Sequence, residues 1–134
     1  MKKKVVLIIS TIAIIGIAFF SYKYFSEQEL SQKKEGCLNA HNLITQYIQN
    51  DERLNDQRHN TIEDLFYSEK KQSCLYFMKS AFVRANWDAS GEWYELIDAW
   101  NGHKDIVTRE CWYEKEGDCK NKEKAFKEIV KDYK

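Results

Sequence analysis

Four cysteines are the residues of this 134-residue chain whose chemistry is easiest to interpret from type and spacing. They lie at Cys37, Cys74, Cys111 and Cys119. An even number of cysteines in a small domain outside the cytoplasm predicts two disulfides, with three possible pairings. The alternative is a zinc site of four thiolates, but such sites usually carry closely paired C-x2-C cysteines. We therefore expect disulfides, and we favour Cys37–Cys74 together with Cys111–Cys119.

The histidines and acidic residues give little indication of catalysis. His41, His59 and His103 are isolated and lack the H-E-x-x-H spacing of a metal site. Four oxidised cysteines would leave no thiolate nucleophile. Asp98 is the most notable acid, because the apolar residues Ile97 and Ala99 flank it. We expect its carboxylate to cap the nearby Asn-Gly turn or to pair with a lysine. The alternative is a functional, buried acid with a raised pKa. We expect no catalytic residue, no metal and no cofactor.

An aromatic cluster is the best indication of a binding surface. Its candidate partner-binding residues lie within one stretch of 26 residues: Trp87, Trp93, Tyr94, Trp100 and Trp112. In a strand, Trp93 would point to one face, and Tyr94 and Trp100 to the other. A single sheet between two helices cannot easily bury both faces, so some rings are expected to be exposed to a protein or a glycan. The alternative is that these rings form the core of a small domain.

The first 25 residues predict a membrane anchor. Three lysines at positions 2–4 precede an uncharged run from Val5 to Phe20, in which eleven of sixteen residues are Val, Leu, Ile or Phe. Continued to Tyr22, the run gives about 27 Å of helix, close to the ~30 Å hydrocarbon core of a bilayer. The lysines favour a cytoplasmic N-terminus, so the rest of the chain would lie outside the cytoplasm. A signal peptide cleaved near Ala18 is the alternative, and it predicts the same compartment.

The remaining residues, 26–134, are enough for one domain. Without the three lysines at positions 2–4, the chain keeps 18 basic and 21 acidic residues, a net charge of −3. The two signs are mixed along the chain, which does not resemble the basic surface of a nucleic-acid-binding protein. The expected partners are therefore the lipid bilayer, through Val5 to Tyr22, and an unidentified protein or glycan.

Periodicity and turn residues predict an α+β domain. The capping box Ser26-x-x-Glu29 indicates the start of a new helix, and the closing helix has one apolar face. The Asn-Gly pair at 101–102 is typical of a type I′ turn between two strands. The expected order is a helix over 26–49, a loop over 51–60, an ambiguous segment over 61–67, strands over 73–83, 92–100 and 103–112 separated by turns at 86–91 and 101–102, and a helix carrying Ala125, Phe126, Ile129, Val130 and Tyr133.

One stretch resembles a known pattern. Residues 67–76 read Tyr-Ser-Glu-Lys-Lys-Gln-Ser-Cys-Leu-Tyr. They are similar to the Tyr-Ser-x-Lys-x-x-x-Cys-apolar-Tyr hairpin motif of small exported bacterial proteins, and the resemblance extends over about 35 residues. It implies a hairpin and an extracytoplasmic location, and it implies no particular activity.

The sequence therefore predicts a membrane-anchored, extracytoplasmic interaction or accessory module without enzymatic activity. Three alternatives belong to other classes. One is an extracytoplasmic hydrolase that uses carboxylates near Asp98. The others are a pilin-like subunit of an envelope machine and an inhibitor of host or competitor enzymes.

Overall fold

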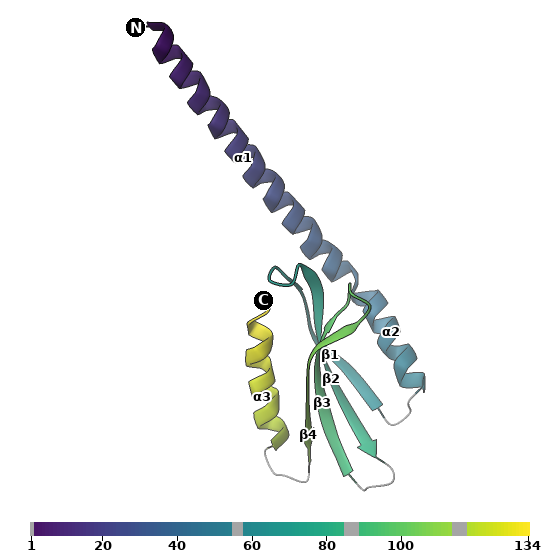
Figure 1. Ribbon diagram of the computed structural model, residues 1–134. Coiled ribbons are helices and arrows are strands. Elements are labelled where there is room, and N and C mark those ends of the chain that lie inside the picture. Colours follow the sequence, from purple (N-terminus) through teal and green to yellow (C-terminus); the bar gives the residue numbers. More distant parts are fainter. Residues whose placement is uncertain (1, 55–57, 85–88, 114–117) are drawn as a thin grey trace. The chain divides into compact units, whose positions relative to one another are not determined.

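The structure is a computed structural model. It describes residues 2–54, 58–84, 89–113 and 118–134, with the side chains of 14–50, 58–83, 90–113 and 118–134 (Figure 1). The chain divides into two compact units, Met1–Lys33 and Lys34–Lys134.

The first unit is formed by the larger part of one long helix, α1 (Lys2–Asn39). The capping box at Ser26 does not start a new helix, because residues 20–35 contain no glycine or proline that would interrupt the preceding one. In the described ranges, no helix combines the length and the apolar character needed to cross a membrane. The transmembrane helix predicted over Val5 to Tyr22 is therefore not supported by this structure.

The second unit is a four-stranded sheet with helices. Its strands follow the order β1-β2-β3-β4, and every neighbouring pair is antiparallel. The predicted α+β class, the meander and the closing helix are confirmed. The elements are α2 (His41–Leu54), β1 (Arg58–Ser68), β2 (Ser73–Arg84), β3 (Ala89–Asp98), β4 (Lys104–Trp112) and α3 (Asp118–Lys131).

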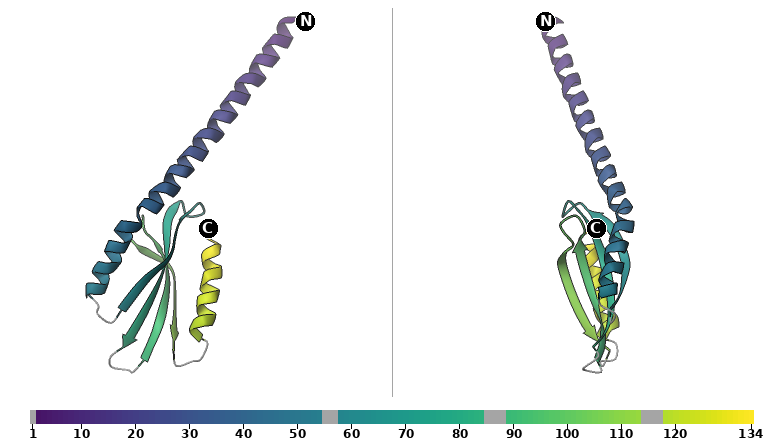
Figure 2. Two further views of the ribbon diagram at one scale, coloured as in Figure 1. Left: turned by 180° about the vertical axis from the view of Figure 1, so that it is seen from behind. Right: turned by 90° about the vertical axis from the view of Figure 1, so that its right-hand side faces the viewer.

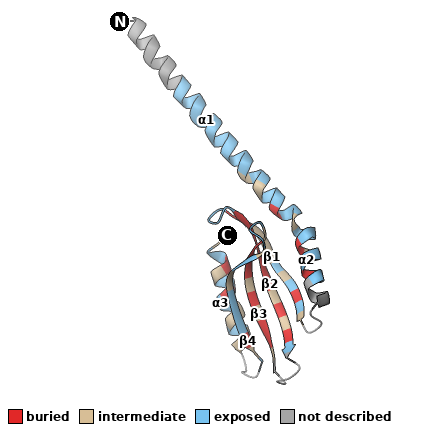
Figure 3. Ribbon diagram, turned by 45° about the vertical axis from the view of Figure 1, so that its right-hand side comes forward, coloured by how far each residue is buried: buried red, intermediate tan, exposed pale blue. Residues whose placement is uncertain are grey.

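Two helices cover opposite faces of this sheet (Figure 2). On what we call the α3 face, Phe126 and Val130 pack against Leu75, Phe77, Tyr94, Leu96 and Cys111. On the α2 face, Ile44 and Ile48 pack against Tyr76, Met78 and Ile97. Both central strands are therefore apolar on both sides, and the buried residues in Figure 3 concentrate on β2 and β3.

Several element bounds differ from the prediction. Helix α2 continues to Leu54 and β1 begins at Arg58, so the loop predicted over 51–60 is wrong at residues 51–54 and 58–60, while residues 55–57 lie outside the described ranges. The ambiguous segment 61–67 is a strand. Strand β3 begins at Ala89, before the predicted start at residue 92, because Gly91 can pair closely with both neighbouring strands. It ends at Asp98, two residues before the predicted end.

The β3–β4 turn differs in detail from a type I′ Asn-Gly turn. Positive φ angles occur at Gly102 (69°) and His103 (55°), one residue later than predicted. The Asp98 carboxylate stabilises the turn, because its Oδ1 accepts hydrogen bonds from the backbone N–H groups of Trp100 (3.2 Å) and Asn101 (3.1 Å). It also accepts a hydrogen bond from the Ser73 hydroxyl. The interpretation of Asp98 as a turn cap is thus confirmed.

All four cysteines form disulfides in the favoured pairing, Cys37–Cys74 and Cys111–Cys119. The first bond joins the end of α1 to the start of β2, and the second joins the end of β4 to the start of α3. Each bond therefore attaches a helix to the sheet.

Candidate functional site

The end of the sheet at which β2 stops and β3 begins carries two side-chain clusters, one on each face. On the α2 face lies an aromatic cluster made of Arg58, Phe82, Trp93 and Trp112. On the α3 face lies a carboxylate cluster made of Lys79, Glu92, Tyr94, Tyr113 and Glu123. Neighbouring residues of β3 contribute to both clusters, because side chains alternate along a strand.

In the aromatic cluster, Phe82 is the central ring. Its centroid lies 4.8 Å from that of Trp93 and 5.3 Å from that of Trp112. The Arg58 guanidinium lies 4.0 Å from the centroid of the half-buried Trp93 ring, in a cation–π arrangement. The Trp93 indole N–H donates to the Glu110 carboxylate at 3.2 Å. Arg58 thus occupies a surface of Trp93 on which a sugar would otherwise stack.

The other aromatic candidates lie elsewhere. Tyr94 is fully buried on the α3 face, as the strand alternation predicted relative to Trp93. Trp100 is 46% exposed in the β3–β4 turn, beyond the end of β3, and its ring centroid lies 5.7 Å from that of Tyr67. Trp87 lies outside the described residues. The structure therefore brings together Trp93 and Trp112 and separates them from Tyr94 and Trp100.

An open groove of about 380 Å³ runs beside the aromatic cluster. It is lined by Trp93, Glu95, Thr108, Arg109 and Glu110. The half-buried Trp93 ring thus borders this groove together with the exposed residues Thr108 and Glu110, and it is accessible there, as Trp100 is in the turn.

The edge of β4 is not well suited to pairing with another strand. The Thr108 carbonyl accepts a hydrogen bond from the Arg109 side chain at 2.9 Å, and the Glu110 carbonyl accepts one from Lys122 at 3.1 Å. Side chains that occupy carbonyl groups of an edge strand disfavour strand addition. A partner of this region would therefore be expected to contact side chains of the groove.

The carboxylate cluster centres on Glu92, which is buried (9% exposed). Its side chain accepts hydrogen bonds from the Tyr94 hydroxyl and, at 2.6 Å, from the Tyr113 hydroxyl. Lys79 lies 3.0 Å from the Glu92 carboxylate and 3.4 Å from that of Glu123. A buried charge needs such partners, because a carboxylate without them would be strongly destabilised.

These contacts change the acidities of the cluster. Burial acts to raise the pKa of Glu92, but hydrogen bonds from Tyr113, Tyr94 and Lys79 outweigh it and lower that pKa. Burial and the negative Glu92 raise the pKa of Tyr113 from 10.0 to about 12, and they raise the pKa of Tyr94 as well. Burial acts to lower the pKa of Lys79, but Glu92 and Glu123 raise it overall. At neutral pH the cluster therefore holds charged Glu92 and Lys79 between two neutral tyrosines.

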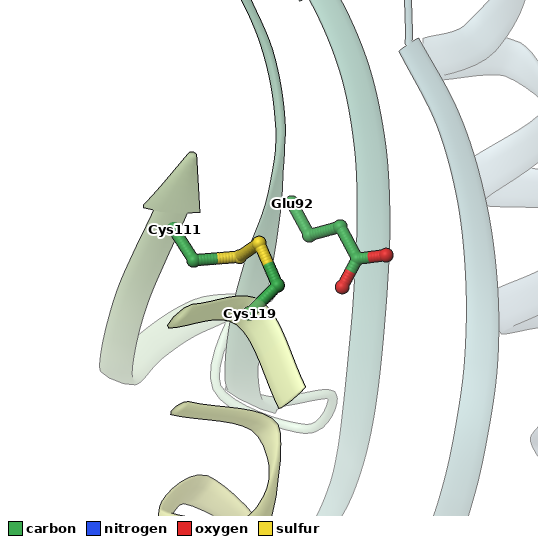
Figure 4. Close-up of side chains that lie close together, drawn as sticks. All are labelled: Glu92, Cys111 and Cys119. Atoms are coloured by element: carbon green, nitrogen blue, oxygen red, sulfur yellow. A yellow bond between two sulfur atoms is a disulfide. The ribbon is translucent and has the colours of Figure 1, made fainter. Parts of the chain in front are cut away.

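The Cys111–Cys119 disulfide lies next to Glu92 (Figure 4). The Glu92 carboxylate and the two sulfur atoms lie within 4.8 Å of one another. The Tyr94 hydroxyl oxygen, whose proton is donated to Glu92, also lies 3.7 Å from the Cys111 sulfur and 3.2 Å from the Cys119 carbonyl oxygen. Glu92 was not predicted from the sequence as a site residue. The available signal was that side chains alternate along a strand, so that Glu92 and its neighbour Trp93 lie on opposite faces. The pairing of Glu92 with Cys111 depends on the β3–β4 register and could not be read from the sequence.

A second groove, of about 350 Å³, lies near the turns at the other end of the sheet. It is lined by Lys71, Asp98, Asn101, Lys104, Asp105 and Ile106. Two acids, Asp98 and Asp105, therefore border one polar space. However, Oδ1 of Asp98 already accepts three hydrogen bonds, from Ser73 and the turn backbone, which limits its availability as a base.

Comparison of the chain with family models, with curated proteins and with solved structures finds no match.

Proposed function

We propose that this protein is an extracytoplasmic interaction module without enzymatic activity, held at a membrane by its N-terminal apolar segment. The observation that carries the proposal is the exposure of the apolar side chains in the first unit. Between residues 14 and 25, its large apolar side chains are at least 63% exposed: Ile14, Ile15, Ile17, Phe19, Phe20, Tyr22, Tyr24 and Phe25.

Such a continuous apolar surface is unusual for a water-exposed helix, and a lipid bilayer is the partner whose chemistry fits it best. The sequence supports the same partner, since the uncharged run begins at Val5 and three lysines precede it. The two disulfides support an extracytoplasmic location for the second unit, because disulfides persist in oxidising compartments.

For the partner-binding surface, the groove beside Trp93 is the best-supported candidate. The exposed Glu110 could accept hydrogen bonds there, and Trp93 and Thr108 add apolar contact area. We expect a protein partner in preference to a glycan, because Arg58 already covers part of the Trp93 ring.

The anchor is tested by fractionating cells that express the full chain. Ile14→Lys together with Ile17→Lys should move the protein from the carbonate-resistant membrane fraction to the soluble fraction, because each lysine costs about 2.5–3.5 kcal/mol inside a bilayer. Ser26→Lys together with Ser31→Lys adds the same charge outside the apolar run and should leave the protein in the membrane. A wild-type protein that carbonate extracts completely would contradict the anchor.

The binding surface is tested with a photo-crosslinking amino acid at position 108. Crosslinked species should form in intact cells and should be lost after Glu110→Lys. The matched control is Glu128→Lys on the exposed part of α3, which should keep them. If the groove position yields no crosslink, or if both variants behave alike, the proposed surface is wrong.

A carboxylate-dependent hydrolase is the second candidate, because Asp98 and Asp105 border the same polar groove. Asp105 is exposed and is the better candidate for a base. Hydrolysis of ester or glycoside test substrates by the full chain, abolished by Asp105→Asn, would favour this function over the interaction module.

A further inference from the structure

Three potential metal ligands meet at the start of α3. They are the Glu92 carboxylate and the sulfur atoms of Cys111 and Cys119, all within 4.8 Å of one another (Figure 4). Two sulfurs bound to one zinc ion at about 2.3 Å lie roughly 3.8 Å apart in a tetrahedral site. The three side chains are thus close enough to bind one ion after small rotations, provided that the disulfide is open.

The two disulfides differ in accessibility. Cys37, Cys74 and Cys111 are fully buried, whereas Cys119 is partly exposed at the start of α3. Thiol–disulfide exchange requires that a thiolate reach a sulfur atom. Cys111–Cys119 is therefore the disulfide with a partly exposed residue, and we expect a reductant to attack it at Cys119, while both residues of Cys37–Cys74 are buried.

We propose that reduction of the Cys111–Cys119 disulfide by a dithiol creates a zinc site, in which the Cys111 and Cys119 thiolates and the Glu92 carboxylate bind one ion. Three protein ligands leave a fourth position of the tetrahedral ion for water or another small ligand.

The reduction is an ordinary thiol–disulfide exchange. A thiolate of the dithiol attacks the Cys119 sulfur and forms a mixed disulfide, and Cys111 leaves as a thiolate. The second thiol of the reductant then attacks the mixed disulfide, which frees Cys119 and leaves the reductant as its own disulfide. Two electrons thus pass from the dithiol to the protein, and zinc binding releases the protons of the two thiols.

Contacts that do not depend on the disulfide hold the ligands together. Glu92 and Cys111 are direct partners in the β3–β4 pairing. Helix α3, which carries Cys119, is held on the sheet by the burial of Phe126 and Val130. Opening the disulfide therefore leaves the three side chains attached to elements that are still packed against one another.

The surroundings of Glu92 also suit a bound ion. Zinc with two thiolates and one carboxylate carries a net charge of −1, and Lys79, 3.0 Å from Glu92, supplies the balancing positive charge. Tyr94 and Tyr113 donate hydrogen bonds to the carboxylate, as groups behind metal ligands commonly do. In the carboxylate cluster, Glu92 would thus bind the ion, while Lys79, Tyr94 and Tyr113 would stabilise the bound carboxylate.

The order of reduction is measured first, on the full chain in detergent micelles. The protein is titrated with a dithiol, alkylated and digested, and the modified cysteines are identified by mass spectrometry. Cys111 and Cys119 should be alkylated at dithiol concentrations that leave Cys37 and Cys74 oxidised. Opening of Cys37–Cys74 first, or of both bonds together, would contradict the proposal.

Metal binding is then measured with Co²⁺, whose thiolate charge-transfer absorption reports sulfur ligation, and Zn²⁺ is added as a competitor. The selectively reduced protein should bind one Co²⁺, which one equivalent of Zn²⁺ displaces, and the oxidised protein should give no charge-transfer band. Absence of the band in reduced protein that keeps its native circular dichroism would overturn the proposal.

Matched variants assign the ligands. Glu92→Gln should weaken Zn²⁺ binding at least tenfold, whereas Glu123→Gln, which contacts Lys79 but lies outside the ligand set, should change it less than threefold. The double variant Cys111→Ser, Cys119→Ser keeps only the thiols of Cys37 and Cys74. When it is fully reduced, its Zn²⁺ affinity gives the background binding by those two thiols. Equal affinity in this variant and the wild type would assign the metal to Cys37 and Cys74 and refute the site.

Discussion

The ring of Phe82 lies over Gly91, its direct partner on the neighbouring strand. A Cβ atom at position 91 would come within 3.0 Å of the Phe82 ring and 2.1 Å of the Cys111 carbonyl oxygen. The ring thus fills the space that a side chain at 91 would need, and from there it contacts Trp93 and Trp112. The absence of a side chain at one position of β3 is what allows the aromatic cluster to assemble.

Gly91→Ala should therefore destabilise the protein strongly. The new methyl group would clash with the Cys111 carbonyl oxygen of β4, so β3 and β4 must separate there, and the Phe82 ring must also shift. Overpacking of this kind costs about 1–3 kcal/mol. We expect a lower midpoint of urea unfolding, measured by circular dichroism. Gly36→Ala is the control, because a Cβ there meets only Trp100, at an ordinary 3.9 Å, and alanine favours the helix. Unchanged stability of Gly91→Ala would mean that neither the Cys111 carbonyl nor the Phe82 ring lies as close to residue 91 as described.

The two tryptophans of β3 and its turn should differ in their contribution to stability. Trp93→Ala removes contacts with Arg58 and Phe82 and should lower the free energy of unfolding by about 2–3 kcal/mol. Trp100→Ala removes a ring that is 46% exposed and should cost less than about 1 kcal/mol. If Trp93→Ala abolished crosslinking of a partner without changing stability, its ring would be a binding residue and not a packing residue.

The carboxylate cluster predicts a characteristic response to alkaline pH. Burial and the hydrogen bond to Glu92 raise the pKa of Tyr113 from 10.0 to about 12. The stabilisation that the neutral Tyr113 hydroxyl gives the folded protein is therefore complete below pH 10 and is lost as the pH rises through 12. The ultraviolet absorbance of tyrosinate, compared between wild type and Tyr113→Phe, should show one tyrosine ionising near pH 12. In Glu92→Gln that tyrosine should ionise closer to pH 10. Ionisation near pH 10 in the wild type would show that the Tyr113–Glu92 hydrogen bond is absent.

The two disulfides should contribute unequally to stability. Chain-entropy arithmetic gives about 4 kcal/mol for the 37-residue separation of Cys37–Cys74 and about 2.5 kcal/mol for the 8-residue separation of Cys111–Cys119. Replacing each pair by alanines and measuring urea unfolding should give the larger loss for Cys37–Cys74. The reverse order would indicate that packing around one pair, and not loop length, determines its effect.

The parts of the fold that local sequence patterns determine could be predicted. The apolar face of Phe126 and Val130 has helical spacing, and the chain from Ser73 onward has the composition of a strand. The turn near Gly102 was found because glycine readily adopts positive φ. The favoured disulfide pairing is likewise the one that the structure shows.

The remainder depends on contacts between segments distant in the chain. Thr61 to Tyr67 is a strand because β2 pairs with it, and no local pattern distinguishes that from a helical turn. The meeting of Glu92 with Cys111 requires the β3–β4 register. Arg58 lies on the edge strand β1 and Trp93 on β3, so their contact extends across β2. No local pattern in the sequence predicts that these two residues meet.

The Cys37–Cys74 bond also determines how the chain would respond to cutting and to force. A protease that cleaves any peptide bond between these residues would leave two pieces joined through sulfur, which would run as one band on a non-reducing gel and as two after reduction. Tension applied to the N-terminal helix would likewise bypass α2 and β1 and reach the sheet at β2. That strand is hydrogen-bonded on both sides, so the load would enter the most firmly held part of the domain.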